Sequence, residues 1–170
     1  MEGVERYKVR LLPHNPKWEE EFSVVKKEIE HCWAKNILDI QHVGSTAIRS
    51  IWAKPILDVA VRLKSIGQLD IKALTDRGYE YCGARNESKT YHLFVLRSVS
   101  QLSLRHIHCY DKSEREFDML VGFRNYLNEH SEIALKYQEI KMRLAEQMPD
   151  DRVSYTKAKE EFIKSIFDKL

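Results

Sequence analysis

A helical hydrophobic pattern opens the chain after a short N-terminal segment. Apolar side chains recur there every three or four positions, with charged residues between them, at Trp18, Phe22, Val25, Ile29 and Trp33. Asn15 is a capping residue, and Pro16 suits the first helical position because its missing N–H group would have no partner there. We therefore expect a helix over residues 16–33. The weak alternation of residues 7–12 predicts an edge strand before it.

Two strand patterns follow this helix. Residues 38–43 end at Gly44 and predict one strand, and residues 56–63 predict a second. Apolar side chains fall on both faces of residues 56–63, which is typical of a central strand covered on both sides. Asp58 interrupts this apolar run. Residues 66–77 then have the spacing of a helix.

Three further strand patterns lie in the middle of the chain, at residues 79–82, 91–97 and 104–110. Short polar segments connect them, which favours antiparallel hairpins. The pattern then becomes helical from residue 112 onward. Ser113 and Glu116 have the spacing of a capping box before a first helix.

Two more helices are expected over residues 131–148 and 154–169. A sheet region followed by packed helices indicates an α+β fold, with a mixed β-sheet flanked by helices and a C-terminal helical part over about residues 112–170. The whole length of 170 residues suits one domain, residues 1–170.

Composition and charge narrow the classes of partner. The 28 basic and 26 acidic residues leave a formal charge of +2, which does not favour binding to duplex DNA. No uncharged run approaches the ~20 residues that cross a bilayer, and the charged N-terminal segment is not expected to be a secretory signal. Three widely spaced cysteines without a CxxC motif favour the reducing cytoplasm. The oligomeric state is not determined by these features.

The first candidate site combines a Gly-Ser bend with an acid on the next strand. Gly44 permits close backbone approach, and Ser45 offers a hydroxyl and an N–H group to a phosphate. Asp58, 13 residues after Ser45, lies within an apolar strand, where a carboxylate needs a partner such as a metal or a base, or a place at the open end of the strand. The alternative is a turn glycine, a capping serine and a structural aspartate.

The second candidate is the His-Ile-His sequence in the last predicted strand. His106 and His108 are two positions apart, so a strand directs both imidazoles to one face. Together with a carboxylate they would form a metal site. The alternatives are a polar pair on an exposed face and a phosphate contact without metal.

The segment HVGSTAIRSIWAKPILDVAV resembles the signature segment of the GrpB family, and the resemblance continues through RHIHCYD, FRNYLNEHSEIALKYQEIK and SYTKAKEEFI. It therefore covers nearly the whole chain. The resemblance implies a nucleotidyltransferase-like fold with a candidate site around Gly44, Ser45 and Asp58. In the wider nucleotidyltransferase pattern, Gly-Ser is followed by a pair of acids that hold Mg²⁺ during nucleotidyl transfer. The second position of that pair is Ala60 here, which cannot bind a metal.

Six basic residues dispersed along the sequence are further candidates for phosphate contacts: Lys54, Arg105, Arg124, Lys141, Arg152 and Lys159. Lys54 lies next to the signature segment's strand, and four other candidates fall in the helical segments that resemble the family: Arg124, Lys141, Tyr155 and Lys159. The alternative for such basic side chains is an ordinary solvated surface position.

The leading functional hypothesis is a protein that binds a nucleotide or another phosphorylated small molecule, with Asp58 holding Mg²⁺ for nucleotidyl transfer. A second hypothesis is a binding module without turnover, which Ala60 favours. A third is a phosphohydrolase with Zn²⁺ or Mn²⁺ on Asp58, His106 and His108. If the strand with the two histidines lies beside that of Asp58, the imidazoles would take the place of the missing acid.

Overall fold

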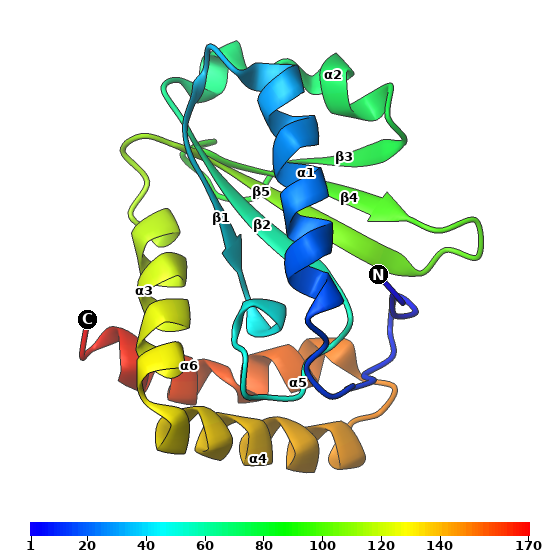
Figure 1. Cartoon of the computed structure of the whole chain (residues 1–170), viewed down its shortest axis with the longest axis vertical. Helices are drawn as coiled ribbons and strands as arrows, with labels where there is room; N and C mark the ends of the chain where they lie inside the picture. Colours follow the sequence, from blue (N-terminus) through cyan, green and yellow to red (C-terminus); the bar gives the residue numbers. More distant parts are fainter.

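The computed structural model describes residues 1–170 and contains one five-stranded sheet with helices around it (Figure 1). The strands are β1 (Ile37–Val43), β2 (Leu57–Leu63), β3 (Tyr79–Ala84), β4 (Tyr91–Arg97) and β5 (Ser103–Asp111). The helices are α1 (Lys17–Trp33), α2 (Ile71–Thr75), α3 (Glu116–Glu129), α4 (Ser131–Gln147), α5 (Arg152–Ala158) and α6 (Glu160–Phe167). Short 3-10 helices cover Ser45–Ala47 and Ile66–Gln68.

The sheet has the strand order β1-β2-β5-β4-β3 and is mixed, as predicted. β2 and β5 run parallel at its centre, and the other three neighbouring pairs are antiparallel. The predicted hairpins β3-β4 and β4-β5 are therefore confirmed. The parallel pair brings residues far apart in the sequence into register, with Asp58 beside His106 and Ala60 beside His108.

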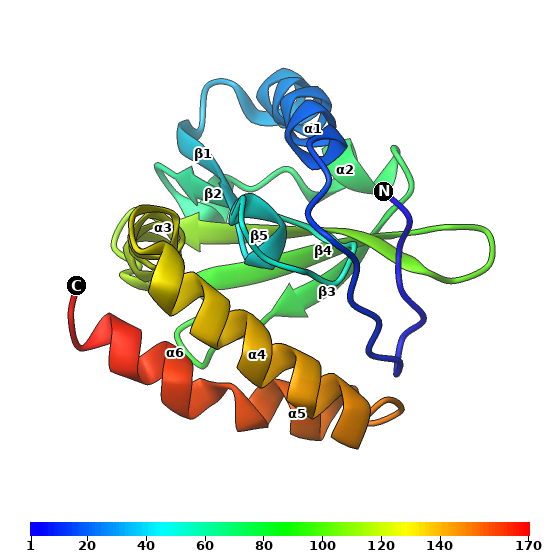
Figure 2. The same ribbon diagram turned by 60° about the horizontal axis from the view of Figure 1, so that its bottom comes forward.

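Helices cover both faces of the sheet. α1 and α2 lie on one side of it in Figure 2, while α4, α5 and α6 lie on the other. α3 also packs against β1 and β2. α4, α5 and α6 lie below the end of the sheet at which β2 begins (Figure 1). We call these three helices the floor helices. None of the helices is both long enough and apolar enough to span a lipid bilayer.

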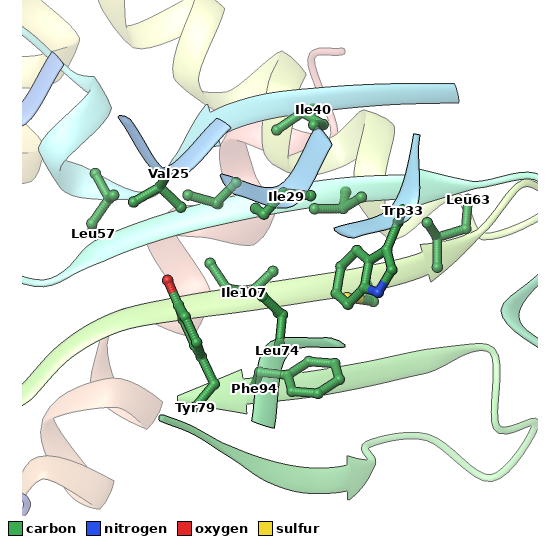
Figure 3. Packing of buried hydrophobic residues seen from close by; sticks show 13 residues of the cluster. Val25, Ile29, Trp33, Ile40, Leu57, Leu63, Leu74, Tyr79, Phe94 and Ile107 are labelled. Carbon is green, nitrogen blue, oxygen red and sulfur yellow. The ribbon is translucent and has the colours of Figure 1, made fainter. Parts of the chain in front are cut away.

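The main hydrophobic core lies between α1 and the sheet. Val25, Ile29 and Trp33 of α1 are buried against β2 and its neighbours, as the predicted stripe requires (Figure 3). Burying an aliphatic side chain of this size stabilises the fold by about 1.5–3 kcal/mol. Alternate residues of β2 and β5 face this core, so the residues between them face α3 and the floor helices.

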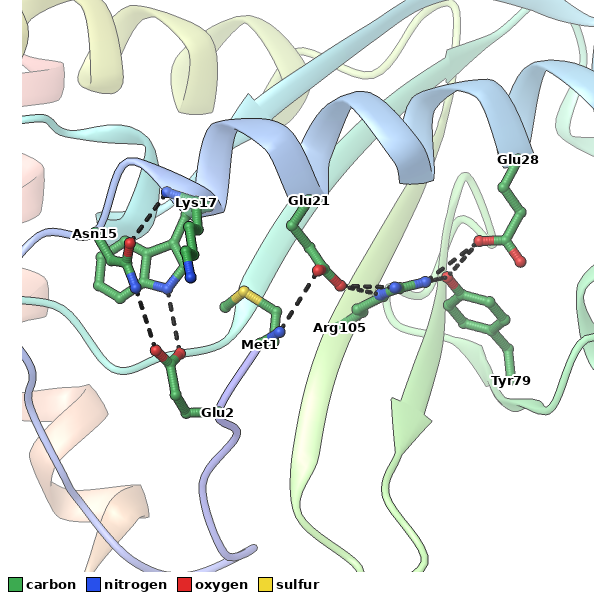
Figure 4. A network of polar contacts seen from close by, with 9 residues as sticks. Met1, Glu2, Asn15, Lys17, Glu21, Glu28, Tyr79 and Arg105 are labelled. Carbon is green, nitrogen blue, oxygen red and sulfur yellow. Dashed lines mark hydrogen bonds and ion pairs between the residues drawn. The ribbon is translucent and has the colours of Figure 1, made fainter.

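A polar network also fixes α1 to the sheet. The guanidinium of Arg105 in β5 donates to Glu21 at 2.6 Å and to Glu28 at 3.4 Å, both on α1, and to the hydroxyl of Tyr79 (Figure 4). All three charged side chains are about one quarter exposed or less. The network therefore orients α1 over the central strands.

Two predicted elements in the N-terminal half differ from the structure. Residues 7–12 form no strand, because Leu12 alone among them forms a β-bridge, with Ala53, and Pro13 next to it has no N–H group for a ladder. The predicted helix over residues 66–77 is a 3-10 turn followed by the short α2. Asp70 caps α2 by accepting the N–H of Ala73, so the chain starts a new helix there.

The C-terminal helices also differ in detail. The expected capping box before α3 does not form, since the hydroxyl of Ser113 donates to Asp111. The last predicted helix is divided into α5 and α6 at Lys159. There the N–H of Lys159 donates to Thr156, three residues back, which tightens the turn.

Candidate active site

The central parallel strands position the first three candidate residues. Asp58 on β2 and His106 and His108 on β5 point away from the face that packs on α1. The imidazole Nδ1 of His106 lies 3.0 Å from Oδ1 of Asp58, and Nε2 of His108 lies 3.3 Å from the same oxygen. The structure thus brings together the aspartate and the two histidines, on neighbouring strands.

Hydrogen bonding keeps the Asp58 carboxyl group ionised. Burial acts to raise the pKa of Asp58, but the hydrogen bonds from His106 and His108 outweigh it and hold that pKa well below its ordinary value. Burial lowers the pKa of His106 in spite of the nearby carboxylate. A neutral His106 can still donate Nδ1–H to Asp58, because an ionised carboxylate only accepts hydrogen bonds.

The Gly44-Ser45 bend lies against Asp58. Val43 pairs with Asp58 across the β1-β2 ladder, and Gly44 follows with φ of 70°. A Cβ atom at Gly44 would lie 2.6 Å from Oδ2 of Asp58, so a side chain there would displace the carboxylate. Glycine is therefore required by close approach as well as by backbone conformation. Ser45 begins a 3-10 turn of three residues.

A cavity of about 250 Å³ lies between these strand ends and the floor helices. It is lined by eight of the ten predicted site residues: Gly44, Ser45, Lys54, Asp58, His106, Lys141, Tyr155 and Lys159. α4 contributes Lys141, α5 contributes Tyr155, and Lys159 stands at the junction of α5 and α6. Residues that are separated by about 100 positions in the sequence thus share one cavity.

Three ammonium groups at this cavity have no acidic partner. Lys54, Lys141 and Lys159 form no ion pair with any carboxylate. The Lys141 ammonium donates to the carbonyl of Trp52, and the ammonium groups of Lys54 and Lys159 lie 5.0 and 4.3 Å from the ring centre of Tyr155. A π face compensates a desolvated cation only in part.

The lysine pKa values respond to this surplus of positive charge. Burial and the positive charge of Lys159 and Arg152 lower the pKa of Lys54 to about 7. Burial also lowers the pKa of Lys159 to about 8. Lys141 is 1% exposed, and burial together with the two other ammonium groups holds its pKa well below 10.5. Burial thus disfavours the charged form of all three cavity lysines.

The remaining two predicted residues lie elsewhere. His108 stands behind Asp58 and His106 and does not line the cavity. Arg124 on α3 is not brought to this cavity: its guanidinium donates to the carbonyl of His42 at 2.7 Å and to Gln41, beside a separate polar hollow. Arg105, a basic residue that charge alone also suggests, is directed to α1 on the opposite face of the sheet.

Sequence reasoning missed two residues of this site, Tyr137 and Tyr91, and named Arg152 only as one of several dispersed basic candidates. Arg152 and Tyr137 line the cavity, and the hydroxyl of Tyr91 lies 2.7 Å from Nδ1 of His108. Tyr137 has the spacing of a helix core residue, and no local pattern distinguishes it from one. Tyr91 reaches His108 only through the register of β4 against β5. Charge alone made Arg152 a candidate, and the structure places it at the cavity.

Comparison with known proteins places this geometry in a family. The model of the GrpB protein family matches residues 8–169. The glutamate-rich protein GrpB of Alkalihalophilus pseudofirmus is 31% identical over 175 residues, which cover 100% of both chains. The UPF0157 protein YqkA of Bacillus subtilis is 30% identical, over 93% of this chain and 46% of its own length.

Solved structures agree with the sequence relatives. The crystal structure of the conserved protein GrpB from Enterococcus faecalis superposes with a TM-score of 0.84 at 29% identity, covering 94% of this chain and 96% of that one. The Cid1 poly(U) polymerase bound to MgATP has a TM-score of 0.53 at 10% identity, over 80% of this chain and 44% of its own. This second likeness establishes a nucleotidyltransferase-like fold. The chain with the lysine-lined cavity beneath its central parallel strands therefore belongs to the GrpB family.

Proposed function

We propose that this protein binds a nucleotide or another phosphorylated small molecule, with the phosphate groups in the cavity beside Gly44 and Ser45. The observation that carries the proposal is a set of three cavity lysines without an ion-pair partner, of which Lys141 and Lys159 are buried and Lys54 is half-buried. Phosphate oxygens are strong acceptors for charged donors, and a multiply charged anion would raise the lysine pKa values again.

A second feature supports an oxygen-rich ligand. Tyr155 is fully buried, lines the cavity and has a hydroxyl group without a hydrogen-bond partner. An unpartnered buried hydroxyl costs free energy, and a phosphate oxygen in the cavity would remove that cost. Arg152 adds a planar guanidinium that suits bidentate contacts with phosphate.

The rest of such a ligand has space beside the cavity. A groove of about 630 Å³ shares His106, Arg152 and Thr156 with the cavity and extends along β4. Apolar side chains of β4, Leu93 and Val95, line part of it. A base or another organic group would occupy this groove while its phosphates occupy the cavity.

The residues present do not fit two magnesium ions. Mg²⁺ prefers oxygen donors in octahedral geometry, and the Cid1 structures are described as bound to MgATP and MgGTP. In this chain, Ala60 stands at the second position of the acid pair, and β5 offers the imidazoles of His106 and His108 in place of a carboxylate. Ligand binding without two-magnesium turnover is therefore the function that these donors favour.

The test uses protein freed of metals and titrated with ATP, inorganic pyrophosphate and adenosine in a calorimeter. We expect ATP and pyrophosphate to bind and adenosine to bind much more weakly. Loss of one charged donor in Lys141→Met removes about 1.5–3 kcal/mol, which weakens pyrophosphate binding about 10–100-fold. Lys136→Met, an exposed lysine on the same helix, is the matched control. Equal affinity of the Lys141 and Lys136 variants would overturn the proposal.

The cellular location follows from the sequence-based expectation. The three cysteines are unpaired, and Cys109 is buried. We propose a cytoplasmic location because a reducing compartment keeps such thiols reduced.

A further inference from the structure

Three metal-binding side chains meet at the wall of the cavity. Asp58, His106 and His108 each offer one donor atom, and these atoms lie within 4.8 Å of one another. They come from facing positions of two parallel strands, so the rigid centre of the sheet holds them. The set consists of one carboxylate oxygen and two imidazole nitrogens.

The spacing of these atoms suits a small tetrahedral ion. Zn²⁺ binds nitrogen and oxygen at about 2.0–2.2 Å, so two of its ligand atoms lie about 3.4 Å apart. Oδ1 of Asp58 is 3.0 Å from the His106 nitrogen and 3.3 Å from the His108 nitrogen. An ion would replace the protons that now join these atoms, with little movement of the strands.

His108 is held in the orientation that a metal ligand needs. Its Nδ1 lies 2.7 Å from the hydroxyl of Tyr91, while Nε2 faces Asp58. Histidine ligands commonly use their second nitrogen in such a hydrogen bond, which fixes the tautomer and the ring position. The ring of Tyr91 also stacks on that of His108, with 5.8 Å between their centres.

The open side of the group faces the cavity. Asp58 and His106 line the cavity, and His108 closes the group from behind. Three protein ligands with a further position open to a ligand or water is the arrangement of many catalytic zinc sites.

We infer that Asp58, His106 and His108 bind one first-row transition-metal ion of the Zn²⁺ class, in preference to Mg²⁺. Imidazole nitrogen is a good donor for Zn²⁺, whereas Mg²⁺ selects oxygen. The site does not depend on the proposed phosphate binding, because its three ligands all come from the protein. A phosphate in the cavity would add to the open side of the ion.

The experiment uses Co²⁺ as a spectroscopic substitute for Zn²⁺. Metal-free full-length protein is titrated with Co²⁺, and the visible absorption of the bound ion is followed. We expect one ion per chain, displacement by an equivalent of Zn²⁺ and no displacement by excess Mg²⁺. Absence of saturable Co²⁺ uptake, or equal competition by Mg²⁺, overturns the inference.

Three variants locate the ion. Removing a ligand in His108→Ala lowers Co²⁺ affinity by more than about 100-fold, and Tyr91→Phe lowers it about 10–100-fold by releasing the orienting hydrogen bond. His92→Ala is the matched control, because His92 has a similar contact with the hydroxyl of Tyr81, at 2.6 Å, but no place in the group. Circular dichroism and thermal melting verify folding. If His108→Ala unfolds, Tyr91→Phe decides, and unchanged affinity in that variant contradicts the inference.

The two proposals fail separately. Lys141→Met should lose pyrophosphate binding and retain Co²⁺ binding, whereas His108→Ala should lose Co²⁺ binding and retain pyrophosphate binding in metal-free protein. If the wild-type protein binds only pyrophosphate or only Co²⁺, the proposal that concerns the other ligand is refuted and the first is unaffected.

Discussion

Replacing Lys159 by methionine should stabilise the protein and lower its affinity for anions. The side chain is 8% exposed, and its ammonium group lies 4.3 Å from the ring centre of Tyr155 and forms no ion pair, although the charge of Asp58 across the cavity acts to raise its pKa. Burial lowers its pKa from 10.5 to about 8, so the folded protein disfavours the charged form by about 3 kcal/mol, at about 1.4 kcal/mol per pKa unit. Loss of the contact with Tyr155 offsets about 1 kcal/mol of the gain. A net stabilisation of about 2 kcal/mol is expected near pH 7.

The gain should depend on pH in a defined direction. The unfolded chain keeps this proton up to its ordinary pKa of 10.5, while the folded protein releases it around pH 8. Below that value both states are charged and the full penalty acts. Between the two values the folded protein is neutral, so the penalty declines as pH rises. The advantage of Lys159→Met should therefore be largest near neutral pH and disappear by about pH 10.5.

Urea unfolding followed by tryptophan fluorescence measures this effect across the pH range. Lys164→Met, an exposed lysine on α6, is the matched control and should leave the free energy of unfolding within about 0.5 kcal/mol of the wild type. A Lys159 variant that is less stable than the wild type near pH 7, or whose effect does not change with pH, would refute the reasoning. The affinity of the Lys159→Met variant for pyrophosphate should fall about 10–100-fold relative to the wild type.

Three further outcomes follow from the same structure. Gly44→Ala should lower the free energy of unfolding by about 3 kcal/mol in a urea titration, because it combines a strained positive φ with a clash against Asp58. Arg105→Met should cost about 2–3 kcal/mol in the same assay, since it leaves the partly buried Glu21 with only the N-terminal ammonium of Met1, at 3.5 Å, as a charged donor. Sulfate binding near pH 8 should take up a proton, because Lys54, with a pKa of about 7, is mostly neutral before the anion enters. Calorimetry in buffers of different ionisation enthalpy measures that uptake, which should vanish near pH 5.

Controls for these outcomes are available in the same chain. Gly83 also has a positive φ, of 77°, but no atom lies within 4 Å of its added Cβ, so Gly83→Ala isolates the cost of backbone strain. Equal losses at Gly44 and Gly83 would exclude the clash. Lys72→Met breaks an exposed ion pair with Asp76 and should cost less than about 0.5 kcal/mol. A comparable loss of unfolding free energy in the Arg105 and Lys72 variants would show that the Arg105 network stabilises the fold no more than an exposed ion pair does. If the heat of sulfate binding near pH 8 does not depend on the buffer, no proton is taken up, which would contradict the prediction that Lys54 becomes protonated when sulfate binds.

Local patterns determined most of the secondary structure. The stripe from Trp18 to Trp33 gave α1, and the apolar run around Asp58 gave a central strand, because a helix or strand needs only the correct period to bury one face. The errors fall where tertiary contacts decide. Asp70 restarts a helix, and the division at Lys159 places its side chain at the cavity.

The candidate site was partly contained in the sequence. The Gly-Ser bend, the aspartate and the two histidines could be identified from the sequence. Strand periodicity also predicted that both histidines point to one face. Periodicity does not fix which strands are neighbours. Only the parallel pairing of β2 with β5 set His106 beside Asp58, and only the pairing of β4 with β5 brought Tyr91 to His108.

The sequence by itself therefore determined the elements, the family and the chemical types at the site. The tertiary structure alone decided that Lys54, Lys141 and Lys159 share one cavity and that Arg124 does not. The physical reason is that a lysine in an amphipathic helix has the same local pattern whether it faces water or a cavity. Its desolvation, its missing carboxylate and its neighbouring charges arise only when α4, α5 and α6 fold under the sheet.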